Sequence, residues 1–249
     1  MNNILLENET LTEVNENINL IQKKNGLTFG TDAFLLASFI KSQKSGIAVE
    51  LGGGTGIISL LCASREKFSK IHCVEIQKDF ADIIDRNAKL NELNGKVISI
   101  CSDIRELKSI NIGCEVDAVF SNPPYMKADG GKRHEYDEKY IARHEVCGNI
   151  YDFCACAKRL LKHGGFFYCV WRPDRLVDLI CAMRENSLEP KEICFVHANT
   201  KSEPSMVLIK AKKGASSSAI IYEPLFLNKD DNPKALTERA QKIYEDCNF

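Results

Sequence analysis

The sequence predicts a doubly wound α/β fold, in which a mostly parallel, seven-stranded sheet ends in an antiparallel hairpin. Two observations predict this fold. From Gly46 onward, strand-like apolar runs alternate with helix-like segments, which is the pattern of a parallel sheet covered by helices on both faces. Near residue 190 the alternation stops, because two strand-like runs follow each other with no helix between them. Such a pair favours an antiparallel hairpin.

The expected strands are short apolar runs, and the expected helices are the longer segments between them. The strands cover residues 47–51, 71–75, 97–101, 116–120, 165–171, 192–197 and 205–212. The helices cover residues 56–65, 78–91, 151–161 and 175–185.

The first 30 residues have the composition of a short polar lead. Residues 18–22 are strand-like and are expected to turn at Lys23-Lys24-Asn25-Gly26. A helix should follow and continue to Lys41, because Thr31 or Asp32 can cap its N-terminus and apolar side chains come next.

Small residues at 214–218 form the one expected linker. Beyond it, residues 220–226 are strand-like, and residues 233–244 favour a helix with Pro233 in its first turn. The expected organisation is therefore an N-terminal lead with a capping helix, a central domain and a C-terminal appendage, covering residues 1–45, 46–213 and 214–249.

Composition is that of an ordinary globular chain. The 249 residues are 44% hydrophobic and carry a formal net charge of −1, so no global field draws the chain to nucleic acid, and an RNA partner would need a local basic face. No apolar segment approaches membrane-spanning length. The first nine residues contain acidic side chains and no basic stretch, unlike a signal peptide. We expect a cytoplasmic protein.

Eleven cysteines are an unusually large and odd number. Most lie inside apolar runs, and Cys154-Ala155-Cys156 has no second pair with the spacing of a zinc site. We expect reduced, buried thiols that pack as small hydrophobic side chains, with no metal bound.

A Gly-rich loop follows the first strand of the central domain, in Glu50-Leu51-Gly52-Gly53-Gly54-Thr55-Gly56. Glycines there let the backbone turn sharply and approach a ligand closely, and ligands of open α/β sheets bind at the carboxyl ends of strands. The loop alone does not separate a dinucleotide from another cofactor, and a structural turn is the plain alternative.

Acidic residues end the next two strands. Glu75 lies about 20 residues after the glycines, where a carboxylate reaches ribose hydroxyls. Asp103 could accept a hydrogen bond from an adenine amino group, or be a solvated turn residue. Together with Asn122, these residues follow successive strands and should open on one edge of the sheet.

The tetrapeptide Asn122-Pro123-Pro124-Tyr125 follows the run at 116–120. Prolines lack an N–H group and have a fixed φ, so the Pro123 carbonyl is a rigid acceptor. The Asn122 amide oxygen is a second acceptor, and the two could hold both hydrogens of a planar amino group while a base stacks on Tyr125. Without the other motifs, a stiff turn would explain the prolines.

In this order, the Gly52 loop, Glu75, Asp103 and Asn122-Pro123-Pro124-Tyr125 resemble the motifs of class I S-adenosylmethionine-dependent amino methyltransferases, whose fold is Rossmann-like. Two flanking segments resemble the bacterial tRNA1(Val) adenine-N6 methyltransferases more narrowly. These are Phe29-Gly30-Thr31-Asp32-Ala33-Phe34-Leu35-Leu36 and Ala142-Arg143-His144-Glu145. The resemblance covers roughly residues 15–212. Glu50 stands where many relatives have Asp, and nothing after Gly214 matches.

The resemblance implies a role for each matching residue. Asn122, Pro123 and Tyr125 would be catalytic and would hold an adenine of RNA, with tRNA as the implied substrate. Glu50 and the Gly loop would hold the methionine part of S-adenosylmethionine, Glu75 its ribose and Asp103 its adenine, with Thr31 and Asp32 closing the site. The implied cofactor-binding set is Thr31, Glu50, Gly52, Gly54, Gly56, Glu75, Asp103 and Asn122.

Other readings remain open from sequence. A glutamine N5-methyltransferase would need a longer helical N-terminal domain than residues 1–45, and many guanine-N2 rRNA methyltransferases have a second, degenerate domain. A catalytically silent cofactor-binding partner would be free to lose Asn122 and Tyr125, and a nicotinamide oxidoreductase has no use for the tetrapeptide. Residues 126–145 form a polar loop of mixed charge, either solvated or acting as a lid.

Overall fold

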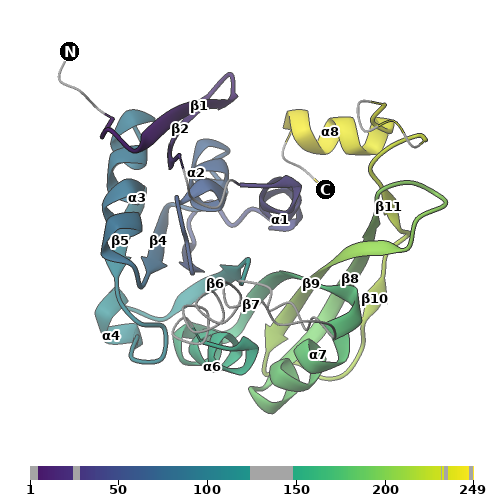
Figure 1. Cartoon of the computed structure of the whole chain (residues 1–249). Coiled ribbons are helices and arrows are strands. Elements are labelled where there is room, and N and C mark those ends of the chain that lie inside the picture. Colours follow the sequence, from purple (N-terminus) through teal and green to yellow (C-terminus); the bar gives the residue numbers. More distant parts are fainter. Residues whose placement is uncertain (1–4, 25–28, 124–147, 231, 233–234, 247–248) are drawn as a thin grey trace, which may run out of the picture.

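The computed structural model describes residues 5–24, 29–123, 148–230, 232, 235–246 and 249. Its central sheet has the strand order β10-β8-β9-β7-β6-β3-β4-β5, with β11 also paired to β8 (Figure 1). The long strands are β3 (Ile47–Leu51), β4 (Lys70–Glu75), β5 (Val97–Cys101), β6 (Val116–Ser121), β7 (Leu161–Trp171), β8 (Leu188–His197) and β9 (Pro204–Lys213).

These seven strands confirm the expected sheet. Neighbours from β5 to β7 are parallel, whereas β9 runs antiparallel to both β7 and β8. The described residues add two short strands to the edge, β10 (Ile220–Ile221) and β11 (Leu225–Phe226), each parallel to β8. The strand-like stretch 220–226 is thus two short pieces rather than one strand.

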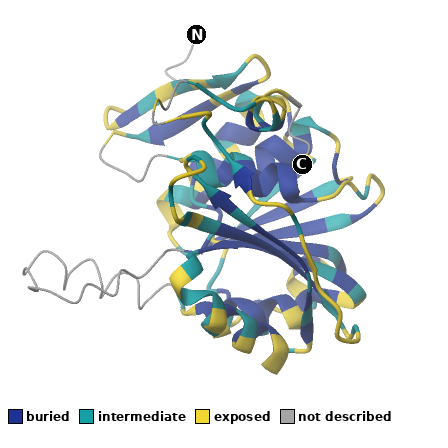
Figure 2. Ribbon diagram, turned by 90° about the vertical axis from the view of Figure 1, so that its right-hand side faces the viewer, coloured by how far each residue is buried: buried dark blue, intermediate teal, exposed yellow. Residues whose placement is uncertain are grey.

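Helices cover both faces of the sheet, and each face has its own apolar cluster. In Figures 1 and 2 the buried strands lie between two helical layers. One layer contains α1 (Thr31–Phe39), α2 (Ile57–Ser64) and α3 (Lys78–Leu90), and the other contains α4 (Ser109–Ile112), α6 (Ile150–Leu160) and α7 (Leu176–Glu185), which follows the 3₁₀ turn η1 (Pro173–Arg175). None of the helices in the described residues has both the length and the apolar character needed to cross a bilayer.

The N-terminal segment differs from the expectation. Residues Glu9–Asn15 form β1, which pairs antiparallel with β2 (Ile18–Lys23), so the structure adds a strand and a turn before Ile18. The expected turn at Asn25-Gly26 lies outside the described residues. In β1 the partly buried Thr10, Thr12 and Val14 alternate with the exposed Leu11 and Glu13. The sequence pattern does not reveal this period of two, because the apolar Leu11 lies on the exposed face.

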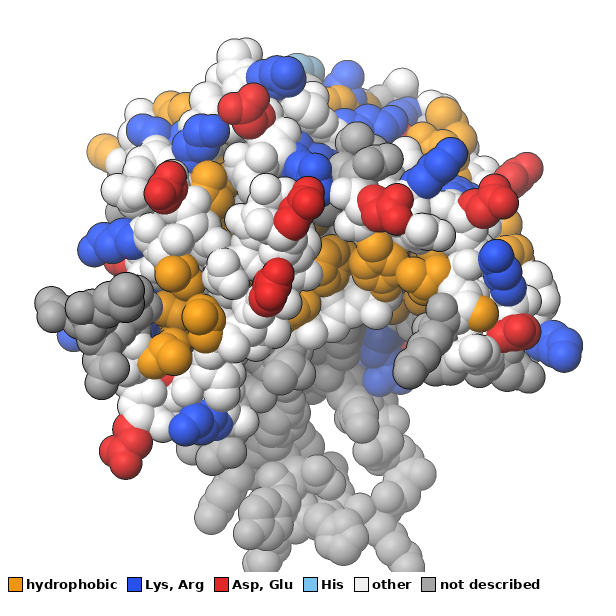
Figure 3. Space-filling model, turned by 90° about the horizontal axis from the view of Figure 1, so that it is seen from above, with side chains coloured by type: hydrophobic (Ala, Val, Ile, Leu, Met, Phe, Trp, Pro, Cys, Tyr) orange, Lys and Arg blue, Asp and Glu red, His pale blue; other side chains and the backbone are white. Residues whose placement is uncertain are grey.

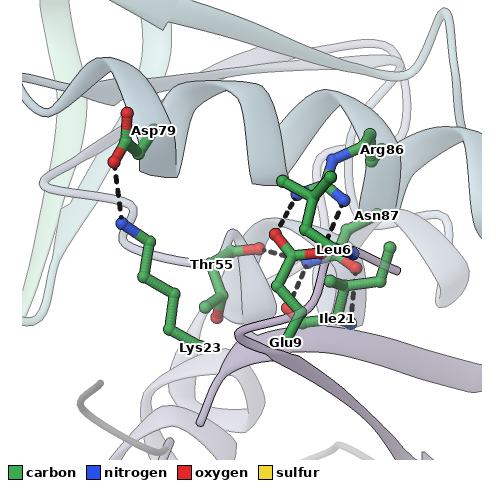
Figure 4. Close-up of polar contacts among 8 residues, drawn as sticks. All are labelled: Leu6, Glu9, Ile21, Lys23, Thr55, Asp79, Arg86 and Asn87. Carbon is green, nitrogen blue, oxygen red and sulfur yellow. Dashed lines mark hydrogen bonds and ion pairs between the residues drawn. The ribbon is translucent and has the colours of Figure 1, made fainter. Parts of the chain in front are cut away.

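Polar contacts hold this hairpin on α3 (Figure 4). The Asn87 side chain accepts from the Ile21 N–H at 2.7 Å and donates to the Ile21 carbonyl at 3.1 Å. The same amide group donates to the Thr55 carbonyl in the Gly-rich loop at 2.9 Å. Arg86 forms two hydrogen bonds with the Glu9 carboxylate and thereby lowers the pKa of Glu9. Asn87 is fully buried, so it is an internal link between hairpin, α3 and loop.

The C-terminal segment packs against α1 and β8 (Figure 1). Helix α8 (Glu238–Asp246) starts later than residue 233, and Pro233 lies outside the described residues. Rings of Tyr244 and Phe34 lie 5.5 Å apart. The buried Glu192 carboxylate accepts from Lys41, Lys210 and the Tyr222 hydroxyl at 2.8–2.9 Å, which joins this segment to the central sheet.

Candidate active site

Strand order brings the sequence-predicted residues to one edge of the sheet. Strand β3 lies between β4 and β6, β5 lies beside β4, and all four run parallel. The Gly-rich loop, Glu75, Asp103 and Asn122 come at or directly after the carboxyl ends of these strands. Their common edge is therefore confirmed, and it is the edge where open α/β sheets bind ligands.

The Gly-rich loop is tied to the end of β4. The N–H groups of Gly52 and Gly53 both donate to the Val74 carbonyl at 2.9 Å. Gly52, Gly54 and Gly56 have φ values of 72°, 56° and 82°, in the left-handed region that favours glycine. A Cβ placed on Gly54 would meet nothing within 4 Å, whereas one on Gly53 would lie 2.2 Å from the Cys73 Sγ. Gly54 therefore borders open space, and Gly53 is needed for packing.

Glu75 lies beneath the open side of this loop. Its carboxylate is buried and accepts from the Gly54 and Gln77 N–H groups, both at 2.9 Å. A carboxylate oxygen has more than one lone pair, so these two bonds leave acceptor capacity for the hydroxyl groups of a ligand.

Glu50 faces inward, toward the N-terminus of α2. Its Oε2 accepts from the Ser59 N–H at 2.9 Å, from the Ser59 hydroxyl and from the Cys73 thiol at 3.4 Å. Burial raises the pKa of Glu50 to about 7, and the bonds from Ser59 and Cys73 oppose this rise. These contacts connect the end of β3 with α2 and β4 and engage the Glu50 carboxylate within the protein. Contact between Glu50 and the methionine part of a cofactor therefore stays a prediction.

A Glu50→Gln variant should alter how stability depends on pH. The pKa of Glu50 is about 7 in the folded protein against 4.5 ordinarily, so its stabilising contribution is complete below pH 4.5 and is lost as pH rises through 7. The loss is on the order of 3 kcal/mol. Glutamine is neutral throughout and lacks this loss. Urea unfolding at pH 5 and pH 8 measures it.

The exposed Glu16→Gln variant is the control for that experiment. The free energy of unfolding of Glu16→Gln should equal that of the wild type at both pH values. Parallel profiles for wild type and Glu50→Gln would show that the Glu50 carboxyl titrates normally.

Asp103 lies in the turn after β5 and is paired with Arg105. The Arg105 Nε lies 3.0 Å from both carboxylate oxygens, and this hydrogen bonding lowers the pKa of Asp103. The Arg105 side chain is largely exposed. The structure thus places Asp103 at the expected edge but with its carboxylate already engaged, and adenine recognition stays a prediction.

Asn122 follows β6 on a firmly held backbone. The preceding Ser121 is buried, and its hydroxyl donates to the Leu51 carbonyl at the end of β3 at 2.7 Å. The Asn122 amide Nδ2 donates to the Asp32 Oδ2 at 2.8 Å. Pro123 is buried, and Pro124 and Tyr125 lie outside the described residues.

Helix α1 begins differently from the expectation. Its N-cap is Gly30, without a side-chain cap, so neither Thr31 nor Asp32 caps the helix. Both lie in the first turn, where the Asp32 Oδ1 accepts from the Ala33 N–H at 2.9 Å. A Cβ on Gly30 would lie 2.9 Å from the Asp32 Oδ1, so a side chain there would crowd this carboxylate.

A cavity of about 210 Å³ adjoins Asp32. Most of its wall was not predicted from the sequence. Trp171 ends β7 and Arg172 follows it, and β9 begins opposite them because it runs antiparallel to β7. A tryptophan that ends a predicted strand, followed directly by an arginine, was an available signal. The lining residues are Thr31, Asp32, Trp171, Arg172, Ser205 and Met206.

The described cysteines include nine with free thiols, mostly buried. Burial raises the pKa of Cys154 and Cys156 to about 12. Within the described part of the chain no group of His, Cys, Asp and Glu side chains could hold a metal ion.

Comparison with known proteins decides the family. The methyltransferase small domain family matches residues 23–179, more than half of the chain. The chain belongs to this family. It is an S-adenosylmethionine-dependent methyltransferase with a Rossmann-like fold. The family match spans the Gly-rich loop and the strand ends described above.

The curated relatives share about a quarter of their residues with this chain. The chain is 28% identical over 187 residues to a tRNA1(Val) (adenine(37)-N6)-methyltransferase of Phocaeicola vulgatus, covering 74% of this chain and 76% of the relative. It is 25% identical over 224 residues to a protein of the same name from Bacteroides fragilis, covering 90% and 88%.

Solved structures share the fold. A predicted O-methyltransferase from Agrobacterium tumefaciens has a TM-score of 0.69 at 20% identity, covering 88% of this chain and 97% of that one. The T. thermophilus 16S rRNA N2 G1207 methyltransferase has a TM-score of 0.55 at 15% identity, covering 79% and 47%.

Proposed function

We propose that the protein methylates N6 of an adenine in tRNA. The observation that carries this proposal is the position of Asn122, held at the carboxyl end of β6 next to the Gly-rich edge. An amide there suits a planar amino acceptor. The names of the curated relatives support adenine and tRNA as the substrate class.

The strand-end residues fit S-adenosylmethionine. The open side of Gly54 admits a ligand close to the backbone, and the Glu75 carboxylate beside it has acceptor capacity for a ribose diol. When bound, S-adenosylmethionine supplies a methyl group on a positively charged sulfur. We assign ribose binding to Glu75 and the remaining contacts to the Gly-rich loop and Asp103.

Asn122 and Pro123 would hold the reacting amine. An adenine amino group is a poor nucleophile, since its lone pair is conjugated with the ring. Two acceptors favour a more tetrahedral nitrogen, whose lone pair forms the new N–C bond while the C–S bond breaks and its electron pair goes to sulfur. The methylated nitrogen then loses a proton to water, so no general base is required. Positioning dominates, and a shift of about 1 Å can cost on the order of 10²-fold.

The base must leave its helix or already lie in a loop, because a stacked base cannot enter such a site. The cavity beside Asp32 offers an apolar wall from Trp171 and Met206 and a cation from Arg172. We propose that this cavity receives part of the RNA substrate, with Tyr125 as a stacking surface.

On the face shown in Figure 3, charge does not single out a broad docking surface. The face in Figure 3 has Lys and Arg side chains interspersed with Asp and Glu. The net charge of −1 agrees with this balance. The proposal therefore relies on local recognition at the sheet edge, and affinity for RNA should depend on few phosphate contacts.

The direct test is nucleoside analysis. Digested tRNA from cells with and without the gene is compared by mass spectrometry, and purified protein is assayed with unmodified tRNA1(Val) and labelled S-adenosylmethionine. We expect N6-methyladenosine to depend on the gene and on the protein. Labelled N2-methylguanosine or methylated glutamine would preserve the enzyme class and refute the substrate.

A Glu75→Ala variant should bind S-adenosylmethionine more weakly. The ribose hydroxyls lose a charged acceptor, and such bonds contribute about 1.5–3 kcal/mol each. Calorimetry with the free protein measures the change, and NAD serves as the negative ligand. Glu75→Gln, which keeps one acceptor oxygen, should lie between the wild type and Glu75→Ala. Unchanged affinity in Glu75→Ala would remove Glu75 from the cofactor site.

Tyr125 variants should separate stacking from hydroxyl chemistry. Tyr125→Ala removes a stacking surface that contributes about 1–3 kcal/mol per base, so the loss should appear mainly as a higher KM for RNA. Tyr125→Phe keeps the ring and should be close to wild type. Steady-state methyl transfer over a range of tRNA concentrations tests both. Equal losses in the two variants would assign the role to the hydroxyl group.

A further inference from the structure

The contact between Asp32 and Asn122 joins two segments 90 residues apart in the sequence. A side-chain amide has two different ends, an acceptor oxygen and a donor NH2 group. An ionised carboxylate only accepts hydrogen bonds. The Asp32 Oδ2 therefore faces the Nδ2 end of Asn122, at 2.8 Å, and the Asn122 oxygen is turned away from Asp32.

Both partners stand on rigid supports. Asp32 lies in the first turn of α1, whose residues from Leu35 to Phe39 are buried, and its second oxygen accepts from the Ala33 N–H. Asn122 follows Ser121, which is buried and bonded to the end of β3. The contact therefore joins two side chains whose backbones are held in place, and it sets the direction in which the Asn122 amide points.

The contact also places a negative charge behind the amide. A hydrogen bond to an ionised acceptor is stronger than a neutral one, and bonds in a chain polarise one another. The Asp32 carboxylate thus polarises the Asn122 amide, and the Asn122 oxygen becomes a better hydrogen-bond acceptor. This matters where an amine gains positive charge as it takes up a methyl group.

We propose that Asp32 is a positioning residue for methyl transfer, which acts by orienting and polarising the amide of Asn122. This inference rests on the proposed role of Asn122 as the holder of the amine. It applies to any planar amino group that the site accepts. Asp32 also lines the cavity, so the experiment must separate action through Asn122 from direct contact with RNA.

The first experiment compares Asp32→Leu with Asp32→Asn. Leucine has a similar size but no acceptor, and should lower kcat about 10- to 100-fold, with KM for RNA and Kd for S-adenosylmethionine within about threefold. The amide oxygen of asparagine can accept the same Asn122 hydrogen, but its NH2 group then faces the Ala33 N–H, which loses its acceptor. Asp32→Asn should therefore recover part of this loss. A loss confined to KM, or no loss in Asp32→Leu, would overturn the proposal.

The second experiment exchanges the two residues. Asn122→Asp alone sets two carboxylates against each other and should be nearly inactive. The pair Asp32→Asn with Asn122→Asp restores one donor and one acceptor across the contact, and should exceed Asn122→Asp by about tenfold or more. A residue that only touches RNA would give no such recovery, so an exchange no better than Asn122→Asp overturns the proposal.

Folding and substrate identity are controlled separately. Thermal unfolding checks each variant, and if Asp32→Leu does not fold, Asp32→Asn and the exchanged pair decide. The variants are assayed on whichever acceptor the wild type methylates. A wild type that labels guanine N2 or glutamine would refute the tRNA adenine proposal and still allow the Asp32 proposal to pass or fail.

Discussion

Replacing Asn122 by alanine is expected to abolish methyl transfer while leaving the affinity for S-adenosylmethionine within a few fold. Asn122 is proposed to hold the target amine, whereas the cofactor is assigned to the Gly-rich loop and Glu75. The loss should appear in kcat, because an acceptor aimed at the amine acts mainly in the transition state. Tritium transfer to unmodified tRNA and calorimetry with the cofactor measure the two quantities.

Asn17→Ala is the matched control for that experiment, since Asn17 is exposed in the turn between β1 and β2. It should leave transfer and cofactor affinity unchanged. Near-normal turnover in Asn122→Ala would refute the amine-holding role. A parallel collapse of cofactor affinity would instead place Asn122 in the cofactor site.

The second large effect is expected from Gly53→Ala. The added Cβ would lie 2.2 Å from the Cys73 Sγ, and Cys73 is fully buried on β4. Overpacking of this kind typically costs about 1–3 kcal/mol. The loop would have to move away from β4, which displaces Gly54 from Glu75 and should lower cofactor affinity about tenfold or more. Urea unfolding and calorimetry measure both losses.

Removing the sulfur should restore the loop. In Gly53→Ala combined with Cys73→Ala, the nearest remaining atoms are the Ile84 Cδ1 at 3.4 Å and the Cys73 Cβ at 3.8 Å, which are ordinary contacts. The pair should therefore bind the cofactor nearly as well as Cys73→Ala alone. If the double variant binds the cofactor as weakly as Gly53→Ala, the clash with Cys73 does not cause the loss of affinity. The loss would then come from the reduced backbone freedom of residue 53.

The parallel sheet could be predicted because each of its strands is a short apolar run that ends at a distinctive residue. Glu75 and Asn122 stand directly at such ends, and parallel strands bring their carboxyl ends together. Pattern alone therefore predicted that these residues share one edge of the sheet.

Features that depend on distant pairs were not accessible in this way. The polar strand β1 is stabilised by its pairing and by Arg86 on α3, which local composition does not report. Glu50 lies just before the glycines of the loop, a position that predicts contact with a ligand. Its carboxylate instead points inward, because Ser59 near the N-terminus of α2 donates hydrogen bonds to it. The contact between Asp32 and Asn122 could be predicted only by knowing that the start of α1 lies beside the end of β6.

The buried Asn87 should couple the hydrogen-exchange rates of the hairpin and the Gly-rich loop. The Ile21 amide hydrogen is held by the same side chain that grips the Thr55 carbonyl (Figure 4). An opening that exposes one of these groups to solvent weakens the hold on the other, so the two segments belong to one local unfolding unit. The exchange rate at Ile21 is thereby a distant reporter of order in the loop.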